Sequence, residues 1–277
     1  MSYLSTEQKP ITPITLSTLN QYKARGETFS CLTCYDASFA AAMQQAQIDT
    51  ILIGDSLGMV VQGHGSTLPV TVADMVYHTQ SVARANSHAL ILCDLPFLAY
   101  ATLPDAIANS RAVMQAGAHV VKIEGGAELV PIVRVLADNG VPTCVHLGLT
   151  PQSVNLFGGY KVQGKTDSAA AKLLEDCRAV VEAGAAILLL ECVPATLAAK
   201  ITAEFAVPVI GIGAGVDCDG QVLVMHDMLG VYTRKPAKFV KDFLTDASNT
   251  SGDIIGAFQA YHQAVKHRAF PTAAHSF

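Results

Sequence analysis

The sequence predicts an α/β protein, a (β/α)8 TIM barrel with an extra N-terminal helix. Eight short runs rich in Leu and β-branched residues recur along the 277 residues, and amphipathic, helix-like stretches lie between them. Strands that alternate with helices pair in parallel through crossover connections. The runs are almost continuously apolar, as expected for strands that are covered on both faces. About 250 residues are typical of one such barrel.

The predicted strands fix the number of β/α units at eight. The last of them has the weakest pattern. They cover residues 28–35, 50–54, 89–93, 119–123, 141–145, 186–190, 207–212 and 221–225.

The predicted helices have recognisable ends. Thr71 is placed to cap a helix that runs to about residue 85, with Asp74 in the capping-box position. Thr102 and Pro104 open a helix that stops at Gly117. The others cover residues 127–139, 168–183 and 194–205, and an extra helix over 17–25 precedes the first strand. We expect that extra helix to cover the N-terminal end of the barrel.

We expect one domain over residues 1–277, with 1–27 as an N-terminal capping segment, because the chain contains no linker, low-complexity segment or short repeat. A doubly wound open sheet is the alternative architecture. No G-x-G-x-x-G motif follows the first strand, which counts against a dinucleotide-binding version of it.

The composition excludes several classes of protein. The net charge is −5 and there is no long basic run, so the electrostatic footprint of a nucleic-acid-binding protein is missing. No apolar stretch approaches the roughly 18 residues of a membrane span, and no secretory signal is visible at the N-terminus, so a cytoplasmic location is expected. Only 15% of the residues are charged, which suggests that sister subunits cover part of the surface.

The seven cysteines are best interpreted as buried free thiols. Cys31 and Cys34 form a lone C-x-x-C pair, but residues three apart on a strand face opposite sides and no second pair exists. A metal or redox site is therefore the weaker interpretation, and we expect the thiols to serve as small apolar groups.

Charged residues end several of the predicted strands. Asp55, Asp94, Glu124 and Glu191 each close an apolar run, as does His146. The carboxyl ends of barrel strands meet at one mouth, where active sites of such barrels are built. A single carboxylate after a strand is often only a helix N-cap, but four of them around one rim are less easily explained in that way.

This rim would carry an excess of negative charge. Lys122 lies two residues from Glu124, so both side chains point to the same face of one strand. Lys122 supplies one positive charge and a divalent cation would supply the rest, since unpaired carboxylates would repel one another. Carboxylate oxygens without a Cys/His cluster favour magnesium over zinc. A lone His146 is more often a packed histidine than a ligand.

Two long loops and one glycine-rich segment also stand out. Residues 58–69 and 147–167 are long enough to be lids or binding loops, with disordered loops as the alternative. Gly211, Gly213 and Gly215 are spaced either to cradle an anion or to allow close packing at a strand end.

These segments resemble the ketopantoate hydroxymethyltransferases, also called 3-methyl-2-oxobutanoate hydroxymethyltransferases. The resemblance extends from about Thr12 to the terminal HSF. It is carried by GDSLGMVVQGHGSTLPVTVADMVYHT from Gly54, DLPF from Asp94, VKIEGG from Val121, HLGLTPQSVNLFGGYKVQG from His146, LLLECVP from Leu188 and IGIGAGVDCDGQVLVMHD from Ile210. Two positions depart from the family pattern: Gly65 replaces an Asp, and Cys34 replaces an Ala. The first puts any role of an acid in that loop in doubt.

The resemblance implies a magnesium-dependent enzyme of pantothenate biosynthesis. Its reaction would move a hydroxymethyl group from 5,10-methylenetetrahydrofolate to 3-methyl-2-oxobutanoate, giving 2-dehydropantoate and tetrahydrofolate. It also implies a homo-oligomer, in this family a decamer.

The resemblance further implies roles for individual residues. Asp55, Asp94 and Glu124 would be the magnesium-site acids, and Glu191 would be the proton acceptor. The keto acid would be held by Ser56 and Lys122 together with Asp55 and Asp94. His146 would lie next to these groups without binding the metal or the substrate itself.

Two other functions remain as alternatives at this point. One is a magnesium-dependent carbon–carbon lyase or phosphonate mutase of the isocitrate-lyase type, although the Lys-Lys-Cys-Gly-His-type segment of such enzymes is not found. The other is a barrel that binds a keto acid or folate without turnover.

Overall fold

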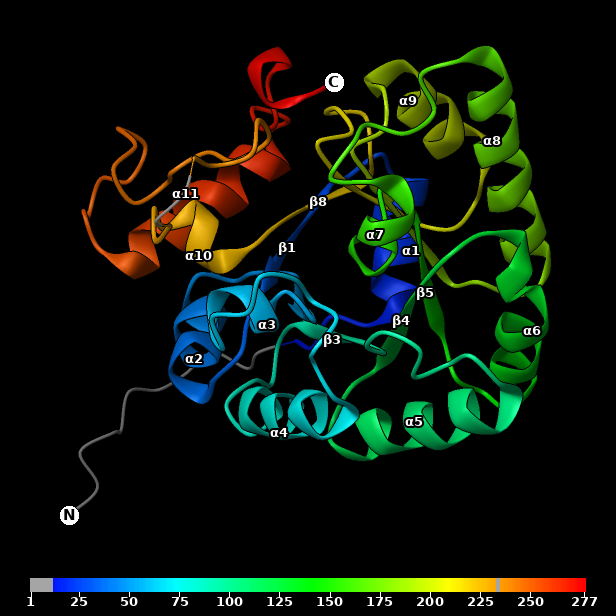
Figure 1. Cartoon of the computed structure of the whole chain (residues 1–277). Coiled ribbons are helices and arrows are strands. Elements are labelled where there is room, and N and C mark those ends of the chain that lie inside the picture. Colours follow the sequence, from blue (N-terminus) through cyan, green and yellow to red (C-terminus); the bar gives the residue numbers. More distant parts are fainter. Residues whose placement is uncertain (1–11, 233–234) are drawn as a thin grey trace.

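The computed structural model describes residues 12–232 and 235–277. Eight parallel strands follow one another in chain order and close into a barrel, with helices on the outside (Figure 1). The predicted barrel is therefore confirmed. The strands are β1 (Phe29–Thr33), β2 (Thr50–Ile53), β3 (Leu90–Asp94), β4 (Val120–Glu124), β5 (Thr143–Gly148), β6 (Ile187–Glu191), β7 (Val209–Ile212) and β8 (Gly220–Leu223).

The helices lie close to the predicted positions. The predicted capping box is present: Thr71 Oγ1 accepts from Asp74 N, and Asp74 Oδ2 accepts from Thr71 N. The helices are α1 (Leu16–Ala24), α2 (Ala37–Gln45), α3 (Leu57–Val60), α4 (Val72–Ala83), α5 (Leu103–Gln115), η1 (Ala127–Leu129), α6 (Val130–Asp138), η2 (Pro151–Ser153), α7 (Val154–Phe157), α8 (Asp167–Glu182), α9 (Ala195–Glu204), α10 (Met225–Met228), α11 (Ile254–Lys266) and η3 (Ala273–His275).

Three local features differ from the prediction. The helix expected over 127–139 is divided into η1 and α6, because Pro131 in the first turn of α6 favours a new helix start. The strand expected over 221–225 ends at Leu223, and Met225 begins α10. Residues 213–219, all of them described, form no helix between β7 and β8. There the chain turns through Gly213 and Gly215, both with positive φ.

The glycines of this turn are required by packing. An added Cβ would lie 2.8 Å from Cys218 Sγ at Gly211 and 2.6 Å from Ala195 Cβ at Gly215. At Gly213 it would lie 3.0 Å from the Phe239 ring. These contacts account for the glycines without an anion, so the packing interpretation is the one the structure supports.

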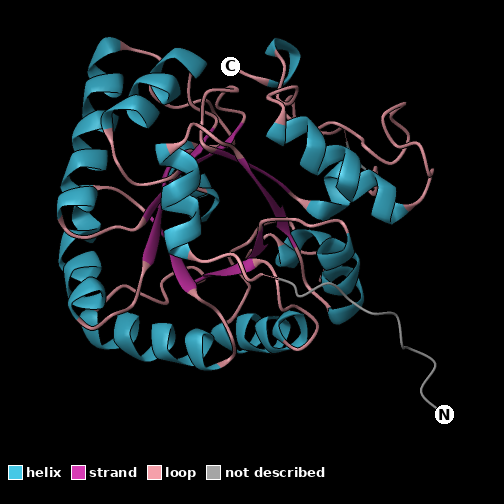
Figure 2. Ribbon diagram, turned by 180° about the vertical axis from the view of Figure 1, so that it is seen from behind, coloured by secondary structure: helices cyan, strands magenta, loops and turns pink. Residues whose placement is uncertain are grey.

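The inside of the barrel is a separate apolar core closed at its N-terminal end by α1. Inward-facing side chains of the strands form one cluster, and Ile14 and Leu19 join it from the N-terminal segment. Leu19 is fully buried. In Figure 2, which shows the molecule from behind, α1 lies across this end of the barrel. The predicted extra N-terminal helix is confirmed.

The cysteines are free and buried, as predicted. Cys31 belongs to the cluster inside the barrel, whereas Cys34 belongs to the cluster between the strands and the outer helices. The two thiols of the C-x-x-C pair therefore face opposite sides of the sheet.

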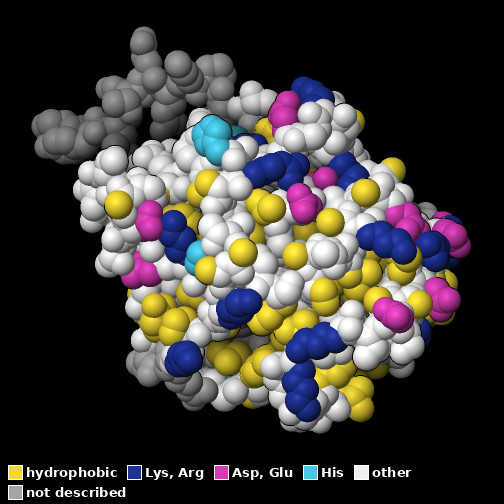
Figure 3. Space-filling view, turned by 90° about the horizontal axis from the view of Figure 1, so that it is seen from above, with side chains coloured by type: hydrophobic (Ala, Val, Ile, Leu, Met, Phe, Trp, Pro, Cys, Tyr) yellow, Lys and Arg dark blue, Asp and Glu magenta, His cyan; other side chains and the backbone are white. Residues whose placement is uncertain are grey.

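The outer surface carries large apolar side chains as well as charged ones. Figure 3 shows apolar side chains between the charged ones on the face seen from above. Tyr77 and Leu98 are among the large apolar residues that remain exposed, at 66% and 63% of their surface. None of the helices in the described part of the chain has both the length and the apolar composition needed to span a bilayer.

The role of α1 can be tested by truncating Leu19, its fully buried side chain. We expect Leu19→Ala to lower the free energy of unfolding by about 2–5 kcal/mol, because it opens a cavity at the bottom of the barrel. Ile107→Ala removes an apolar group that is 46% exposed on α5 and serves as the control. Urea unfolding followed by circular dichroism measures both, and equal effects would show that α1 does not close the core.

Candidate active site

The predicted site residues on strands all point into the mouth of the barrel. Side chains alternate along a strand, and Leu92, Val120, Cys144 and Leu189 face the interior core. The inward set therefore continues at the carboxyl ends of the same strands. Its members there are Asp94 on β3, Lys122 and Glu124 on β4, His146 on β5 and Glu191 on β6. Strand register places Asp94 beside Lys122 and Glu124 beside His146.

These side chains form a continuous chain of polar contacts. Lys122 Nζ donates to Asp94 Oδ1 at 2.6 Å and lies 3.5 Å from Glu124 Oε1. His146 Nδ1 lies 3.0 Å from the same Glu124 oxygen. On its other side, His146 Nε2 is 3.3 Å from Glu191 Oε2, but the geometry falls short of a hydrogen bond. His146 thus stands between Glu124 and Glu191.

Asp55 and Ser56 join the cluster from the end of β2. The Asp55 N–H donates to Asp94 Oδ2 at 3.0 Å, which ties the two acids together through the backbone. Ser56 Oγ and Tyr35 OH share a hydrogen bond of 2.9 Å. The absence of a side chain at Gly54 leaves room for the Ser56 hydroxyl, since a Cβ at this position would lie 2.7 Å from Ser56 Oγ.

Two further residues of the site were not predicted from the sequence. Gln152, in η2, contacts both Asp55 and Glu124, and Tyr100, from the segment after β3, contacts Gln152 and Glu124. Gln152 lies in the long loop 147–167 and in the segment HLGLTPQSVNLFGGYKVQG, and these were the two signals that the sequence offered. Nothing in the sequence pattern marks Tyr100.

The electrostatics of the acids are unequal. Burial, followed by the charges of Asp94 and Glu124, raises the pKa of the Asp55 carboxyl well above its usual range. Burial also acts to raise the pKa of Glu124, but the charges of His146 and Lys122 and its hydrogen bonds lower it to about 2. Asp55 is therefore the acid whose ionised form lacks a compensating charge.

The two bases are held in their protonated forms. Burial acts to lower the pKa of Lys122, but Asp94, Glu124 and Asp55 together raise it well above its usual range. Burial and Lys122 act to lower the pKa of His146, yet the charge of Glu124, its hydrogen bond to His146 and the contact with Glu191 raise this pKa to about 9. The site therefore holds more carboxyl groups than cations. The carboxyl groups are those of Asp55, Asp94, Glu124 and Glu191, and the two cations are Lys122 and His146.

The donor set fits a hard divalent cation. Gln152 Nε2 gives the Asp55 side chain its one hydrogen bond from the described residues, at Oδ2, so Oδ1 is free for another partner. Within residues 12–232 and 235–277, no three His, Cys, Asp or Glu side chains form a ready metal cage. Magnesium does not need one, because it commonly takes one or two carboxylates and completes its shell with waters and substrate oxygens.

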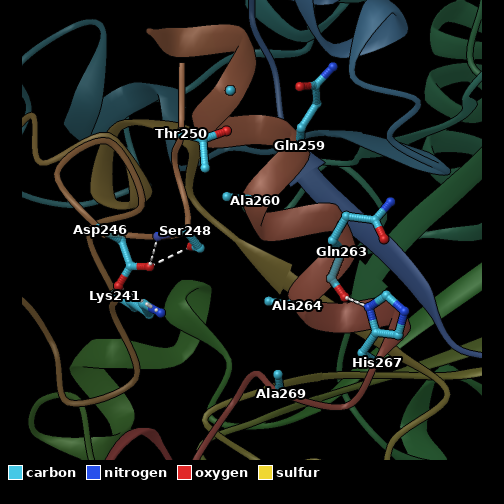
Figure 4. Close-up of a pocket in the computed structure, with 11 residues that line it drawn as sticks. Lys241, Asp246, Ser248, Thr250, Gln259, Ala260, Gln263, Ala264, His267 and Ala269 are labelled. Atoms are coloured by element: carbon cyan, nitrogen blue, oxygen red, sulfur yellow. Dashed lines mark hydrogen bonds and ion pairs between the residues drawn. The ribbon is translucent and has the colours of Figure 1, made fainter. Parts of the chain in front are cut away.

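A separate groove lies in the C-terminal part of the chain. It has a volume of about 430 Å³ and is formed by residues 241–250 and α11, with Lys241, Asp246 and His267 in its lining (Figure 4). Two of its polar side chains are engaged locally: Asp246 accepts from Ser248, and His267 Nδ1 lies 2.9 Å from Gln263 O. None of the predicted site residues lines this groove.

The buried ion pair can be tested directly. We expect Lys122→Met to lower the free energy of unfolding by about 3–5 kcal/mol in metal-free buffer, because Asp94 loses its buried partner. Added Mg²⁺ should restore more stability to this variant than to the unmodified protein. The control is Lys172→Met, which removes an exposed partner of Asp176 and should cost at most about 1 kcal/mol. Equal losses in the two variants would contradict the assignment.

Comparison with solved structures identifies the fold. A phosphoenolpyruvate phosphomutase from Streptomyces platensis subsp. rosaceus is 14% identical, with a TM-score of 0.58 over 78% of this chain and 82% of that one. A phosphonopyruvate hydrolase, solved with oxalate and Mg²⁺, is 11% identical, with a TM-score of 0.59 over 76% of this chain and 80% of that one. At this identity the likeness concerns the barrel alone.

Comparison of sequences identifies the family. The 3-methyl-2-oxobutanoate hydroxymethyltransferase of Psychrobacter arcticus is 68% identical over 263 residues, covering 95% of this chain and 99% of the relative. The protein of the same name from Acinetobacter baylyi is 61% identical over 265 residues, covering 95% and 98%. Residues 13–273 match the family described as ketopantoate hydroxymethyltransferase. The resemblance seen in the sequence is confirmed: the chain belongs to the ketopantoate hydroxymethyltransferase family, whose members are transferases.

Proposed function

We propose that this enzyme transfers a hydroxymethyl group from 5,10-methylenetetrahydrofolate to 3-methyl-2-oxobutanoate, giving 2-dehydropantoate and tetrahydrofolate in pantothenate biosynthesis. The observation that carries the proposal is the name shared by relatives of 61–68% identity over 95% of the chain. The cluster of acids around Lys122 and His146 supports it, because this chemistry needs a base beside a keto acid. The folate donor rests on the family resemblance.

The residues that would hold magnesium are Asp55, Asp94 and Glu124. When bound, the ion would chelate the carboxylate and keto oxygens of the substrate and stabilise the negative charge that develops on the keto oxygen. Glu124 already accepts from Gln152 N and lies beside Lys122 and His146, so we expect it to act through water. Asp55, with its free Oδ1, is the better direct ligand.

Lys122 and Ser56 would hold the keto acid in place. Lys122 is a compact point charge at the centre of the acids, where it offsets their repulsion and can donate to a substrate oxygen. Tyr35 orients the Ser56 hydroxyl. Both groups come from strand ends and are therefore fixed before the substrate arrives.

Glu191 is the proposed proton acceptor for the C3 hydrogen of the keto acid. Its side chain is 14% exposed, more than those of Asp94 and Glu124, and it has no contact with Lys122 among the described residues. It can therefore reach substrate while standing apart from the cation site. His146 lies against it and would hold its carboxylate in position.

Once the C3 proton is on Glu191, C3 forms a bond to the methylene carbon of the folate. Both bonds from that carbon to the two folate nitrogens break, and one water supplies the hydroxyl group of the product. The two nitrogens take up the second hydrogen of that water and the proton held by Glu191, which gives tetrahydrofolate. The 147–167 loop, whose η2 turn contacts the acids through Gln152, is placed to exclude other water from this step.

We also propose that the enzyme is a cytoplasmic homo-oligomer, with the decamer of the family as the expected form. The low share of charged residues and the exposed Tyr77 and Leu98 support subunit contacts. Light scattering measures the mass, and a monomer would contradict this part of the proposal.

The activity itself is tested by incubating the protein with both substrates and Mg²⁺. We expect 2-dehydropantoate and tetrahydrofolate in equal amounts. Cleavage of a carbon–carbon bond in the keto acid would instead support a lyase, and binding without turnover would support a non-catalytic barrel.

The role of Glu191 is tested without the folate. In deuterated water we expect Glu191→Gln to exchange the C3 proton of 3-methyl-2-oxobutanoate about 10²–10⁴-fold more slowly, because the base is lost. Glu204→Gln, on the outside of α9, is the control. Exchange at the unmodified rate in Glu191→Gln, with substrate still bound, would exclude Glu191 as the base.

A further inference from the structure

The η2 turn brings one side chain into contact with two of the proposed metal-site acids. We propose that Gln152, held by Tyr100, is a positioning residue that sets where Asp55 and Glu124 stand at the cation site. This inference rests on the proposed function, because the site it describes is the one that would take magnesium and keto acid.

The Gln152 amide is fully engaged. Its Nε2 donates to Asp55 Oδ2 at 2.9 Å and to Leu95 O at 2.9 Å, which uses both hydrogens. Its Oε1 accepts from Tyr100 OH at 2.7 Å. Because Leu95 directly follows Asp94, the amide fixes Asp55 relative to the end of β3.

The backbone of the same residue reaches the third acid. Gln152 N donates to Glu124 Oε2 at 3.0 Å, on the carboxylate oxygen opposite to the one near Lys122 and His146. Glu124 is therefore held from both sides. A single residue of the loop thus contacts acids that follow or end two different strands, β2 and β4.

Tyr100 fixes the position of the Gln152 amide relative to the end of β4. Its hydroxyl accepts from Glu124 N and lies 3.1 Å from Glu124 O, in addition to its bond with Gln152. Tyr100 and Gln152 are 8% and 6% exposed, so water would not readily replace their hydrogen bonds if either side chain were truncated. The hydroxyl connects the end of β4 to the amide that holds Asp55.

The geometry has a specific consequence for cation binding. Gln152 occupies Asp55 Oδ2 and leaves Oδ1 free, so it determines which oxygen faces the site. Without the amide, Asp55 could turn away from its two acidic neighbours to reduce repulsion. Partners that orient metal ligands typically contribute about 10–100-fold to metal affinity.

The experiment measures binding of Mn²⁺ alone, by calorimetry on the intact protein, with and without 3-methyl-2-oxobutanoate. We expect Gln152→Met and Tyr100→Phe each to weaken Mn²⁺ binding by about 10–100-fold. Because both act through one amide, the double variant should lose less than the product of the single losses.

Matched controls separate positioning from general damage. Gln221→Met removes a buried amide that donates only to Gly215 O, away from the acids, and Tyr77→Phe removes an exposed hydroxyl. Both should bind Mn²⁺ like the unmodified protein. Gln152→Asn, which keeps the amide on a shorter side chain, should recover part of the affinity lost in Gln152→Met.

The possible outcomes are distinct. If the unmodified protein binds Mn²⁺ and folded Gln152→Met and Tyr100→Phe bind it equally well, the positioning role is wrong and the proposed function stands. If the unmodified protein binds no Mn²⁺ with or without keto acid, the metal-dependent function fails and the inference fails with it. Should Gln152→Met not fold, Tyr100→Phe, which loses a single oxygen, decides alone.

Discussion

The excess of buried negative charge at the barrel mouth is the constraint on which the rest of the site depends. Asp55, Asp94 and Glu124 are almost fully buried, and Lys122 is the lysine buried among them. Like charges at this depth repel strongly unless cations or hydrogen bonds compensate them. The protein supplies Lys122, His146 and the Gln152 amide, and this compensation remains incomplete at Asp55. A divalent cation with a bound keto acid would complete it.

The closed sheet makes this concentration of charge possible. Asp94, Lys122, Glu124, His146 and Glu191 continue rows of inward-facing side chains whose lower members are apolar. The apolar layers and α1 shut the barrel from below, so the polar layer opens only at the carboxyl ends of the strands. Strand register then sets the contacts, as in the pairs Asp94–Lys122 and Glu124–His146.

Most of the fold could be predicted from the sequence because the strands and helices are marked by local residue patterns. Continuous apolar runs located the strands, and the caps at Thr71 and Thr102 located two helix starts within a residue. The missing helix between β7 and β8 could not be predicted, since tight contacts at Gly213 and Gly215 belong to the folded structure. From the sequence, the same glycines could either bind an anion or allow close packing. The contacts with Ala195 and Phe239 in the folded structure favour close packing.

For the site, strand-end charges were visible in the sequence, whereas their partners were not. Gln152 and Tyr100 are joined to the acids by hydrogen bonds between segments up to 97 residues apart. A glutamine in a loop and a tyrosine after a strand carry no periodic pattern, so neither could be distinguished from its neighbours. The roles of Asp55, Ser56 and Glu191 came from the family resemblance, and their placement in one mouth gives those roles a physical basis.

The most direct measurement of the central idea is the linkage between cation and keto acid. Mg²⁺ should be titrated into the protein by calorimetry at several concentrations of 3-methyl-2-oxobutanoate, and the keto acid at several concentrations of Mg²⁺. If one cation and one keto acid share the acidic mouth, each must tighten the other by the same factor, with one site per chain. Independent binding of the two ligands, or no uptake of Mg²⁺ at any keto-acid concentration, would contradict the account.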